Sequence, residues 1–120
     1  PGNVKAPLIY RLELLRVSSI ILTVRTVIET ANFQKQADKI WSESERLAFI
    51  DWIAVNPLAG DVIPGADGAR KVRWSIAGKG KRGGVRVIYF NVAEQGVVIL
   101  VMIYQKNDKA NIKPNEIPEV

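Results

Sequence analysis

Basic side chains are concentrated in one short stretch of the sequence. Between positions 70 and 86 lie seven of the 17 lysines and arginines and no acidic residue: Arg70, Lys71, Arg73, Lys79, Lys81, Arg82 and Arg86. A stripe of this kind suits a polyanion, either a phosphodiester backbone or an acidic protein segment. It also suits a solvated sheet face whose charges guard against aggregation. Charge alone does not separate these two interpretations.

The chain contains no cysteine and no histidine. Disulfides, thiolate catalysis and cysteine-based zinc sites are therefore excluded, as is the commonest general base of enzymes. An enzyme built on this sequence must use lysine, arginine, tyrosine or carboxylates. Four carboxylates lie at helical spacing close to basic residues, which favours a solvated helix face over a metal site: Asp38, Glu43, Glu45 and Asp51. We expect neither a metal nor another cofactor.

The spacing within the basic run predicts which side chains share a surface. Side chains alternate across a strand, so Lys71 and Arg73 are expected on one face and Val72 and Trp74 on the other. Arg86 begins the next apolar run and is expected near the same basic face. The glycine-rich turn from 78 to 84 lets the backbone approach a phosphate closely, but it lacks the ending and following helix of a P-loop.

Two tyrosines are further candidates, because a tyrosine beside a basic groove can stack on an exposed base. Tyr89 lies inside an apolar run, which favours a role in the core. Tyr104 ends a strand beside Gln105 and Lys106, and both readings stay open for it.

The secondary-structure elements that must position these residues can be predicted from hydrophobic periodicity and from residues that typically start or end helices. A β-branched run predicts a strand from Ile20 to Ile28, and a short helix is expected from Phe33 to Trp41. Ser42 and Glu45 form a capping-box pattern before a second helix, which the dipeptide Asn56-Pro57 ends. We expect three residues of this second helix on its apolar face, with two more beside them: Leu47, Ile50 and Ala54, then Phe49 and Ile53.

After a Gly/Pro-rich loop from 58 to 68, strands are predicted over 70–76, 84–92 and 97–104. Their short connections make them antiparallel. Pro114 is placed to start a terminal helix. The order predicts an α+β fold, an antiparallel central sheet with the N-terminal helices packed on one face. We expect residues 23–120 to form a single domain and 1–22 an N-terminal extension or arm, in which Leu8 to Arg16 has the spacing of a helix.

No apolar stretch reaches the ~20 residues that span a bilayer, and no clean signal peptide is visible. Pro1-Gly2 reads as a cloning remnant or a product of processing. We expect a cytoplasmic protein.

An ordered series of motifs resembles the HigB-like branch of the RelE/ParE toxin superfamily. It comprises Leu58, Gly60-Asp61, Ile63-Pro64-Gly65 and Gly68, the basic run with its glycine-rich turn, Arg86 to Tyr89, and Ile103-Tyr104 followed by Lys106-Asn107. The resemblance covers roughly positions 26 to 112. RelE-type members carry an arginine where this chain has Asn107 and a tyrosine in the C-terminal tail, which has no counterpart after Tyr104.

The resemblance implies a RelE-like domain and the toxin of a type II toxin-antitoxin system. Such a toxin cuts mRNA in the ribosomal A site and is neutralised by a helix-turn-helix antitoxin, through which it also reaches operator DNA. By position, Lys71, Arg73 and Arg86 match the catalytic set. The resemblance and the chain's basic character place a second group at the RNA and the ribosome: Arg70, Lys79, Lys81, Arg82, Tyr104 and Lys106.

The chemistry expected is metal-independent: the ribose 2′-hydroxyl attacks the adjacent phosphate while lysine and arginine stabilise the developing charge. Without histidine, a lysine whose pKa is lowered has to act as base. Lys71 is the first candidate, with Lys79 or Lys81 behind it, and Arg73 and Arg86 would clamp phosphate. The alternative is a ParE-like inhibitor of DNA gyrase, or a catalytically silent toxin, acting by protein binding on the same fold.

Overall fold

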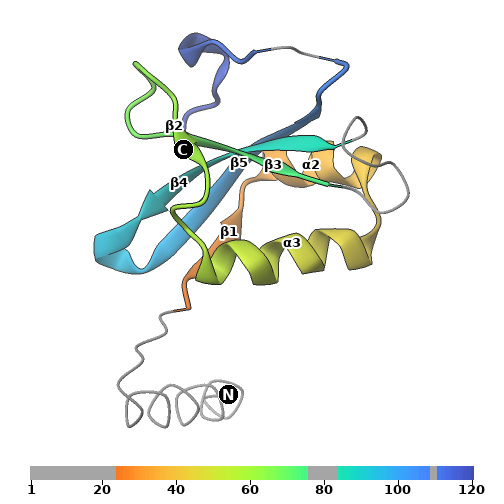
Figure 1. Cartoon of the computed structure of the whole chain (residues 1–120), viewed down its shortest axis with the longest axis horizontal. Helices are drawn as coiled ribbons and strands as arrows, with labels where there is room; N and C mark the ends of the chain where they lie inside the picture. The colour runs from red at the N-terminus through yellow and green to blue at the C-terminus, as the bar shows by residue number, and fades with distance from the viewer. Residues whose placement is uncertain (1–23, 76–83, 109–110) are drawn as a thin grey trace, which may run out of the picture.

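A sheet with a pair of helices on one face forms the body of the protein (Figure 1). The computed structural model describes residues 24–75, 84–108 and 111–120. The described part of the chain starts with strand β1 (Thr26–Glu29), followed by helices α2 (Ala31–Ile40) and α3 (Glu43–Val55). Strands β2 (Asp61–Val62), β3 (Arg70–Trp74), β4 (Val85–Val92) and β5 (Val97–Gln105) follow, with 3-10 turns at Ala93–Gln95 and Pro114–Glu116.

The five strands lie in the order β1-β5-β4-β3-β2. Neighbouring strands from β5 to β2 are antiparallel, whereas β1 runs parallel to β5. A parallel pair needs a long connection, and here the chain passes through both helices and three strands before it returns beside β1. The predicted α+β class with helices on one face is confirmed, and the sheet is mixed rather than wholly antiparallel.

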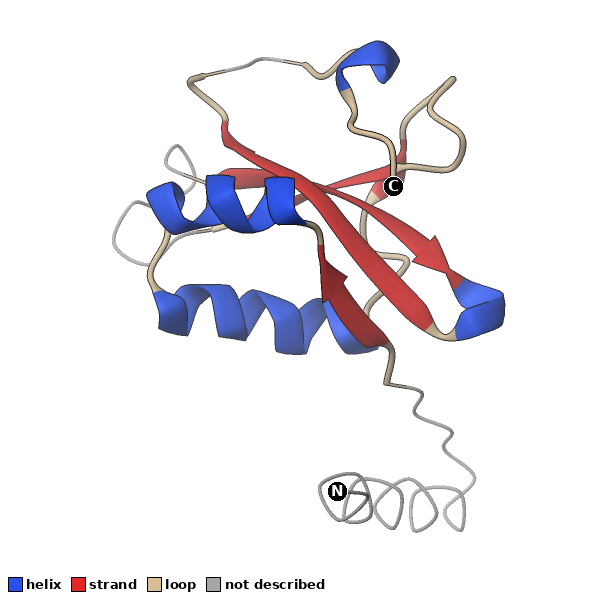
Figure 2. Ribbon diagram, turned by 180° about the vertical axis from the view of Figure 1, so that it is seen from behind, coloured by secondary structure: helices blue, strands red, loops and turns tan. Residues whose placement is uncertain are grey.

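Both helices begin with a side-chain cap. The Thr30 hydroxyl accepts a hydrogen bond from the backbone of Phe33 at the start of α2. At the start of α3, Ser42 and Glu45 form the predicted capping box, in which each side chain satisfies the other residue's backbone N–H. The helices form an antiparallel hairpin on one face of the sheet, as both views show (Figures 1 and 2).

The face that α3 presents to the core differs from the predicted one. Phe49, Ile53 and Ala54 are the buried residues of this helix. Leu47, predicted on the apolar face, is 45% exposed, so that prediction is wrong. The helix is apolar on much of its circumference, and the packing of the aromatic side chains decides which part is buried. Phe49 contacts both Trp41 and Trp74, with ring centroids 5.6 and 5.3 Å apart.

The sheet buries apolar residues on both faces. On the helix side, Phe33, Phe49 and Ile53 pack against Val87 and Leu100. On the other face, residues of the loop between β2 and β3 and of the C-terminal segment cover the sheet: Ile63, Ala66, Ala69, Ile112 and Ile117. Ile88, Met102 and Tyr104 belong to this second cluster, and the basic residues of β3 and β4 lie on the same face of the sheet.

Some strand predictions need correction. The short strand β2 lies inside the stretch predicted as loop, because only two residues pair with β3 there. Of the strand predicted from Ile20 to Ile28, positions 24 to 28 are described, and those before 24 lie outside the described residues. The strand β1 starts only at Thr26 and continues to Glu29. The strand predicted to reach Ile76 ends at Trp74, and residues 76–83 also lie outside the description.

Candidate functional site: a basic face on β3 and β4

The strand register brings Lys71, Arg73 and Arg86 onto one face of the sheet. Arg73 lies directly opposite Arg86 across the β3–β4 ladder, and Lys71 lies opposite Ile88. Arg86 in turn lies opposite Tyr104 on β5. Directly paired residues share a face, so these side chains form one surface on the side away from the helices. We call Lys71, Arg73, Arg86 and Tyr104 the basic face.

Burial distinguishes the three cations of the basic face. Arg73 is exposed and Lys71 is half-buried, whereas Arg86 is only 8% exposed. A fully charged guanidinium is seldom buried unless an anion pairs with it. In the described part of the chain, the recorded salt bridges both belong to Arg46, on the helix side. Arg86 is therefore a buried cation between a second arginine and a tyrosine, a suitable place for an anionic ligand.

The floor of the basic face is apolar. Ile88, opposite Lys71, is fully buried, and Met102 on β5 lies opposite Ile88 and is 8% exposed. An apolar floor limits water around the cations and so strengthens their attraction for a phosphate group. The site residues predicted from the sequence did not include Ile88 and Met102. Strand alternation could have placed Ile88 there, because it follows Arg86 by two residues and therefore shares its face.

Arg70 does not join the basic face. It lies opposite Tyr89, whose side chain belongs to the core on the helix side. Its guanidinium donates to the carbonyl oxygen of Gly60 at 2.6 Å, and more weakly to that of Leu58 at 3.5 Å. The structure thus places this predicted RNA-contacting residue against the loop between α3 and β2, on the face away from Lys71 and Arg73.

Tyr89 lies in the core, as its apolar neighbours in sequence indicated. It is fully buried. Its hydroxyl donates to the carbonyl oxygen of Pro57 at 2.8 Å and accepts from the backbone N–H of Gly60 at 2.9 Å. Burial is the main reason that the pKa of the Tyr89 phenol is raised above its ordinary value. Tyr89 is consequently a neutral side chain with a structural role, and its ring is not available for an RNA base to stack on.

Among the remaining predicted contacts, the structure describes Lys106 and Tyr104. Lys106 is exposed just after β5, and its backbone N–H lies 3.5 Å from the carbonyl oxygen of Gly84, at the start of β4. The turn that contains Lys79, Lys81 and Arg82 lies outside the described residues. Tyr104 is 5% exposed, so its ring offers little surface for stacking on a base.

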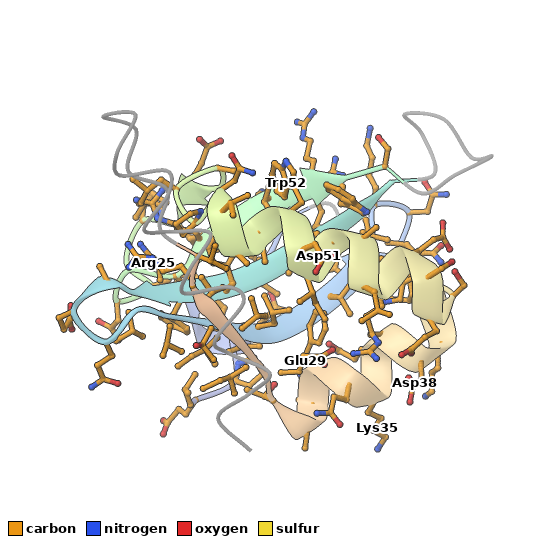
Figure 3. All side chains as sticks on the ribbon, turned by 90° about the horizontal axis from the view of Figure 1, so that it is seen from below. Arg25, Glu29, Lys35, Asp38, Asp51 and Trp52 are labelled. Atoms are coloured by element: carbon orange, nitrogen blue, oxygen red, sulfur yellow. The ribbon has the colours of Figure 1, made fainter. Side chains whose placement is uncertain are left out.

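Three of the four carboxylates predicted as a solvated face are exposed, and the fourth, Glu45, belongs to the capping box of α3. Asp38, Glu43 and Asp51 are exposed. Arg46 joins α3 to β1 through Glu29, with distances of 2.6 and 2.7 Å to its two carboxylate oxygens, and it also pairs with Glu43. These hydrogen bonds, that to Glu29 first, raise the pKa of Arg46. Figure 3 shows Glu29 on β1 and Asp38 on α2, on the helix side of the sheet.

The described residues contain no cluster of three or more acidic side chains that could hold a metal ion. Nor is any helix among them long and apolar enough to cross a membrane. A hollow of about 460 Å³ lies on the same sheet face as the basic residues, but its lining is apolar and acidic and includes Phe90, Ile99, Ile117 and Glu119. This lining contains no lysine or arginine, so the hollow is separate from the basic face.

Comparison with known proteins supports the fold. No family model matches the sequence. Among solved structures, the chain is similar to a mutant of the Escherichia coli toxin RelE in the free state, with a TM-score of 0.53 and 14% sequence identity. The match covers 73% of this chain and 90% of that one. At this identity the match shows the fold alone, and this chain has a RelE-like α+β fold.

Proposed function

We propose that this protein is the toxin of a type II toxin-antitoxin system and an endoribonuclease that cuts mRNA on the ribosome. The observation that carries the proposal is the pairing of Arg73 with Arg86, beside Lys71, on the sheet face opposite the helices. Three cations grouped on a surface with an apolar floor suit a phosphodiester. The RelE-like fold and the resemblance to the HigB-like branch support the same reading.

The proposed reaction needs no metal. The 2′-oxygen of the ribose forms a bond to the adjacent phosphorus and the bond from phosphorus to the 5′-oxygen breaks. The upstream fragment then ends in a cyclic phosphate, and the departing 5′-oxygen takes a proton from water. Lys71 is the proposed base for the 2′-hydroxyl proton. Arg73 and Arg86 bind the phosphoryl oxygens, because a guanidinium keeps its charge and donates in two directions. Burial of Arg86 holds its guanidinium in place before RNA arrives, which favours the transition state.

The partners we propose are mRNA, the ribosome and a helix-turn-helix antitoxin, and through the antitoxin, operator DNA. Lys106 and the turn with Lys79, Lys81 and Arg82 supply further positive charge for RNA or ribosome contacts. The working place of such a toxin is the cytoplasm. Ribosome dependence is reasonable for this site. An active site that has no histidine as its general base depends on precise placement of the substrate, and the ribosome can supply that placement.

The test is cleavage of ribosome-bound mRNA by Lys71→Ala, Arg73→Ala and Arg86→Ala. Each is expected to reduce the cleavage rate by about 100-fold or more, the usual loss when a charge-stabilising group is removed. Lys35→Ala is the matched control, because it removes one positive charge from α2, where Lys35 is exposed and points away from the sheet (Figure 3). Unchanged cleavage in all three variants would exclude the assignment.

The gyrase-inhibiting alternative predicts a different result after induction in cells. Translation arrest with cut mRNA supports the endoribonuclease. DNA damage signalling with intact mRNA would instead support a ParE-like protein that acts by binding, and growth without either effect would indicate a silent toxin.

A further inference from the structure

Side chains of β3 and β4 hold the loop between α3 and β2 to the sheet through hydrogen bonds that converge on Gly60. The Tyr89 hydroxyl accepts from the Gly60 N–H at 2.9 Å and donates to the Pro57 carbonyl at 2.8 Å. Arg70 donates to the Gly60 carbonyl at 2.6 Å. Tyr89 and Arg70 are direct cross-strand partners, so β4 and β3 together hold both backbone groups of one loop residue. We call these contacts the loop anchor.

The loop anchor presses Gly60 against the backbone of Lys71. A Cβ atom at position 60 would lie 2.8 Å from the Lys71 carbonyl oxygen, 2.9 Å from its carbon and 2.9 Å from the Tyr89 ring. Real Cβ atoms essentially never come this close to neighbours, and neither backbone nor a buried ring can move aside cheaply. Glycine is therefore required by space at this position.

Three elements thus hold the backbone of Lys71. Asp61 on β2 and Ile88 on β4 pair with it on its two sides, and Gly60 packs against its carbonyl. The Lys71 side chain leaves this backbone toward the opposite face, where Arg73 and Arg86 lie. A displacement of the loop would move the Lys71 backbone and with it the Lys71 ammonium group. A displacement of a catalytic group by about 1 Å can lower the reaction rate by about 100-fold.

We infer that Gly60, Tyr89 and Arg70 are positioning residues for Lys71, acting from the helix side of the sheet on a reaction that takes place on the other side. This inference rests on the proposed endoribonuclease function. It assigns to Arg70 a role different from RNA contact: Arg70 sets the place of a neighbouring cation through the loop backbone.

The experiment measures kcat and KM for cleavage of ribosome-bound mRNA by Tyr89→Phe, Gly60→Ala and Arg70→Ala. Tyr89→Phe keeps the buried ring and removes only the hydroxyl, so it remains informative even if Gly60→Ala fails to fold. Val98→Ala is the control, since Val98 is a fully buried core residue on β5 that takes no part in the anchor's hydrogen bonds, and its truncation lowers stability. All variants are compared at a temperature where each is folded.

We expect Tyr89→Phe and Arg70→Ala to lower kcat between about 10-fold and 100-fold with little change in KM. Val98→Ala should leave both constants near those of the wild type. An Arg70→Ala variant with raised KM, unchanged kcat and a weaker salt dependence would show direct RNA contact and overturn the inference for this residue.

A second readout follows Lys71 itself. In a protein labelled with carbon-13 at the lysine Cε, the Lys71 signal, identified by its loss in Lys71→Arg, should shift in Tyr89→Phe and stay in place in Val98→Ala. Cleavage by Lys71→Ala separates the two hypotheses. If Lys71→Ala is inactive while Tyr89→Phe behaves like Val98→Ala, the function stands and the positioning role is wrong. If Lys71→Ala cleaves normally, the protein is an endoribonuclease whose base is not Lys71, and the positioning role is wrong. If the wild type does not cleave ribosome-bound mRNA, the proposed function itself is wrong.

Discussion

The pair of arginines that face each other across β3 and β4 should destabilise the fold that holds them. Arg73 and Arg86 are direct cross-strand partners, and like charges in such positions repel. With their charges ~6 Å apart, near the spacing of paired Cβ atoms, the repulsion is about 0.7 kcal/mol in water and about 2.8 kcal/mol at an effective dielectric constant of 20. Because Arg86 is buried and Arg73 exposed, we expect a value between these limits, about 1 to 2 kcal/mol.

A double-mutant cycle measures this repulsion directly. The free energy of unfolding in urea is compared for the wild type, Arg73→Met, Arg86→Met and the double variant. Removing either arginine relieves the same repulsion. The double variant should therefore gain about 1 to 2 kcal/mol less than the sum of the single gains. High salt should reduce this coupling, and inorganic phosphate should stabilise the wild type more than either single variant.

A second cycle with Lys35→Met and Arg73→Met controls for net charge. Lys35 lies on α2, on the other side of the sheet, so its effect should simply add to that of Arg73→Met. Coupling between Arg73 and Arg86 within about 0.3 kcal/mol of zero, or coupling that shows attraction, would refute the argument that the basic face carries unrelieved repulsion. A site that loses stability to hold two cations together is expected where the cations serve binding or catalysis.

Three further measurements test other parts of the structure. Arg46→Met should lower the free energy of unfolding by about 1.5 to 3 kcal/mol, because it leaves the half-buried Glu29 carboxylate without its two charged hydrogen bonds. A urea titration that finds no loss of stability would contradict this. In the same titration, Phe49→Ala should lower the free energy of unfolding by about 3 to 5 kcal/mol and Leu47→Ala by less than about 0.5 kcal/mol, because Phe49 is buried and Leu47 is exposed. Equal losses would mean that the buried face of α3 is assigned wrongly. Because the Tyr89 pKa is raised on folding, the stability it contributes is complete below its ordinary pKa of about 10 and is lost as the pH rises above that value. Urea titrations across this range should show a smaller alkaline loss for Tyr89→Phe than for the wild type, and parallel curves would contradict the raised pKa.

Local sequence signals were sufficient for most of the elements. The capping box at Ser42, the stop at Asn56-Pro57 and the β-branched runs predicted the helices and the three long strands, because each depends on neighbouring residues only. Strand alternation likewise placed Lys71 and Arg73 on one face. The absence of histidine and cysteine limited the possible catalytic side chains to lysine, arginine, tyrosine and carboxylates, independently of the fold.

Only the tertiary structure decided what depends on contacts distant in sequence. The parallel pairing of β1 with β5 and the short strand β2 leave no local signature. Neither does the buried face of α3, where packing with Trp41 and Trp74 selects Phe49 over Leu47. Strand alternation already puts Arg70 on the opposite face from Lys71, but only the fold brings the carbonyl oxygen of Gly60 within 2.6 Å of its guanidinium. A single-residue step along a strand reverses the face, so neighbouring cations in sequence acquire different roles.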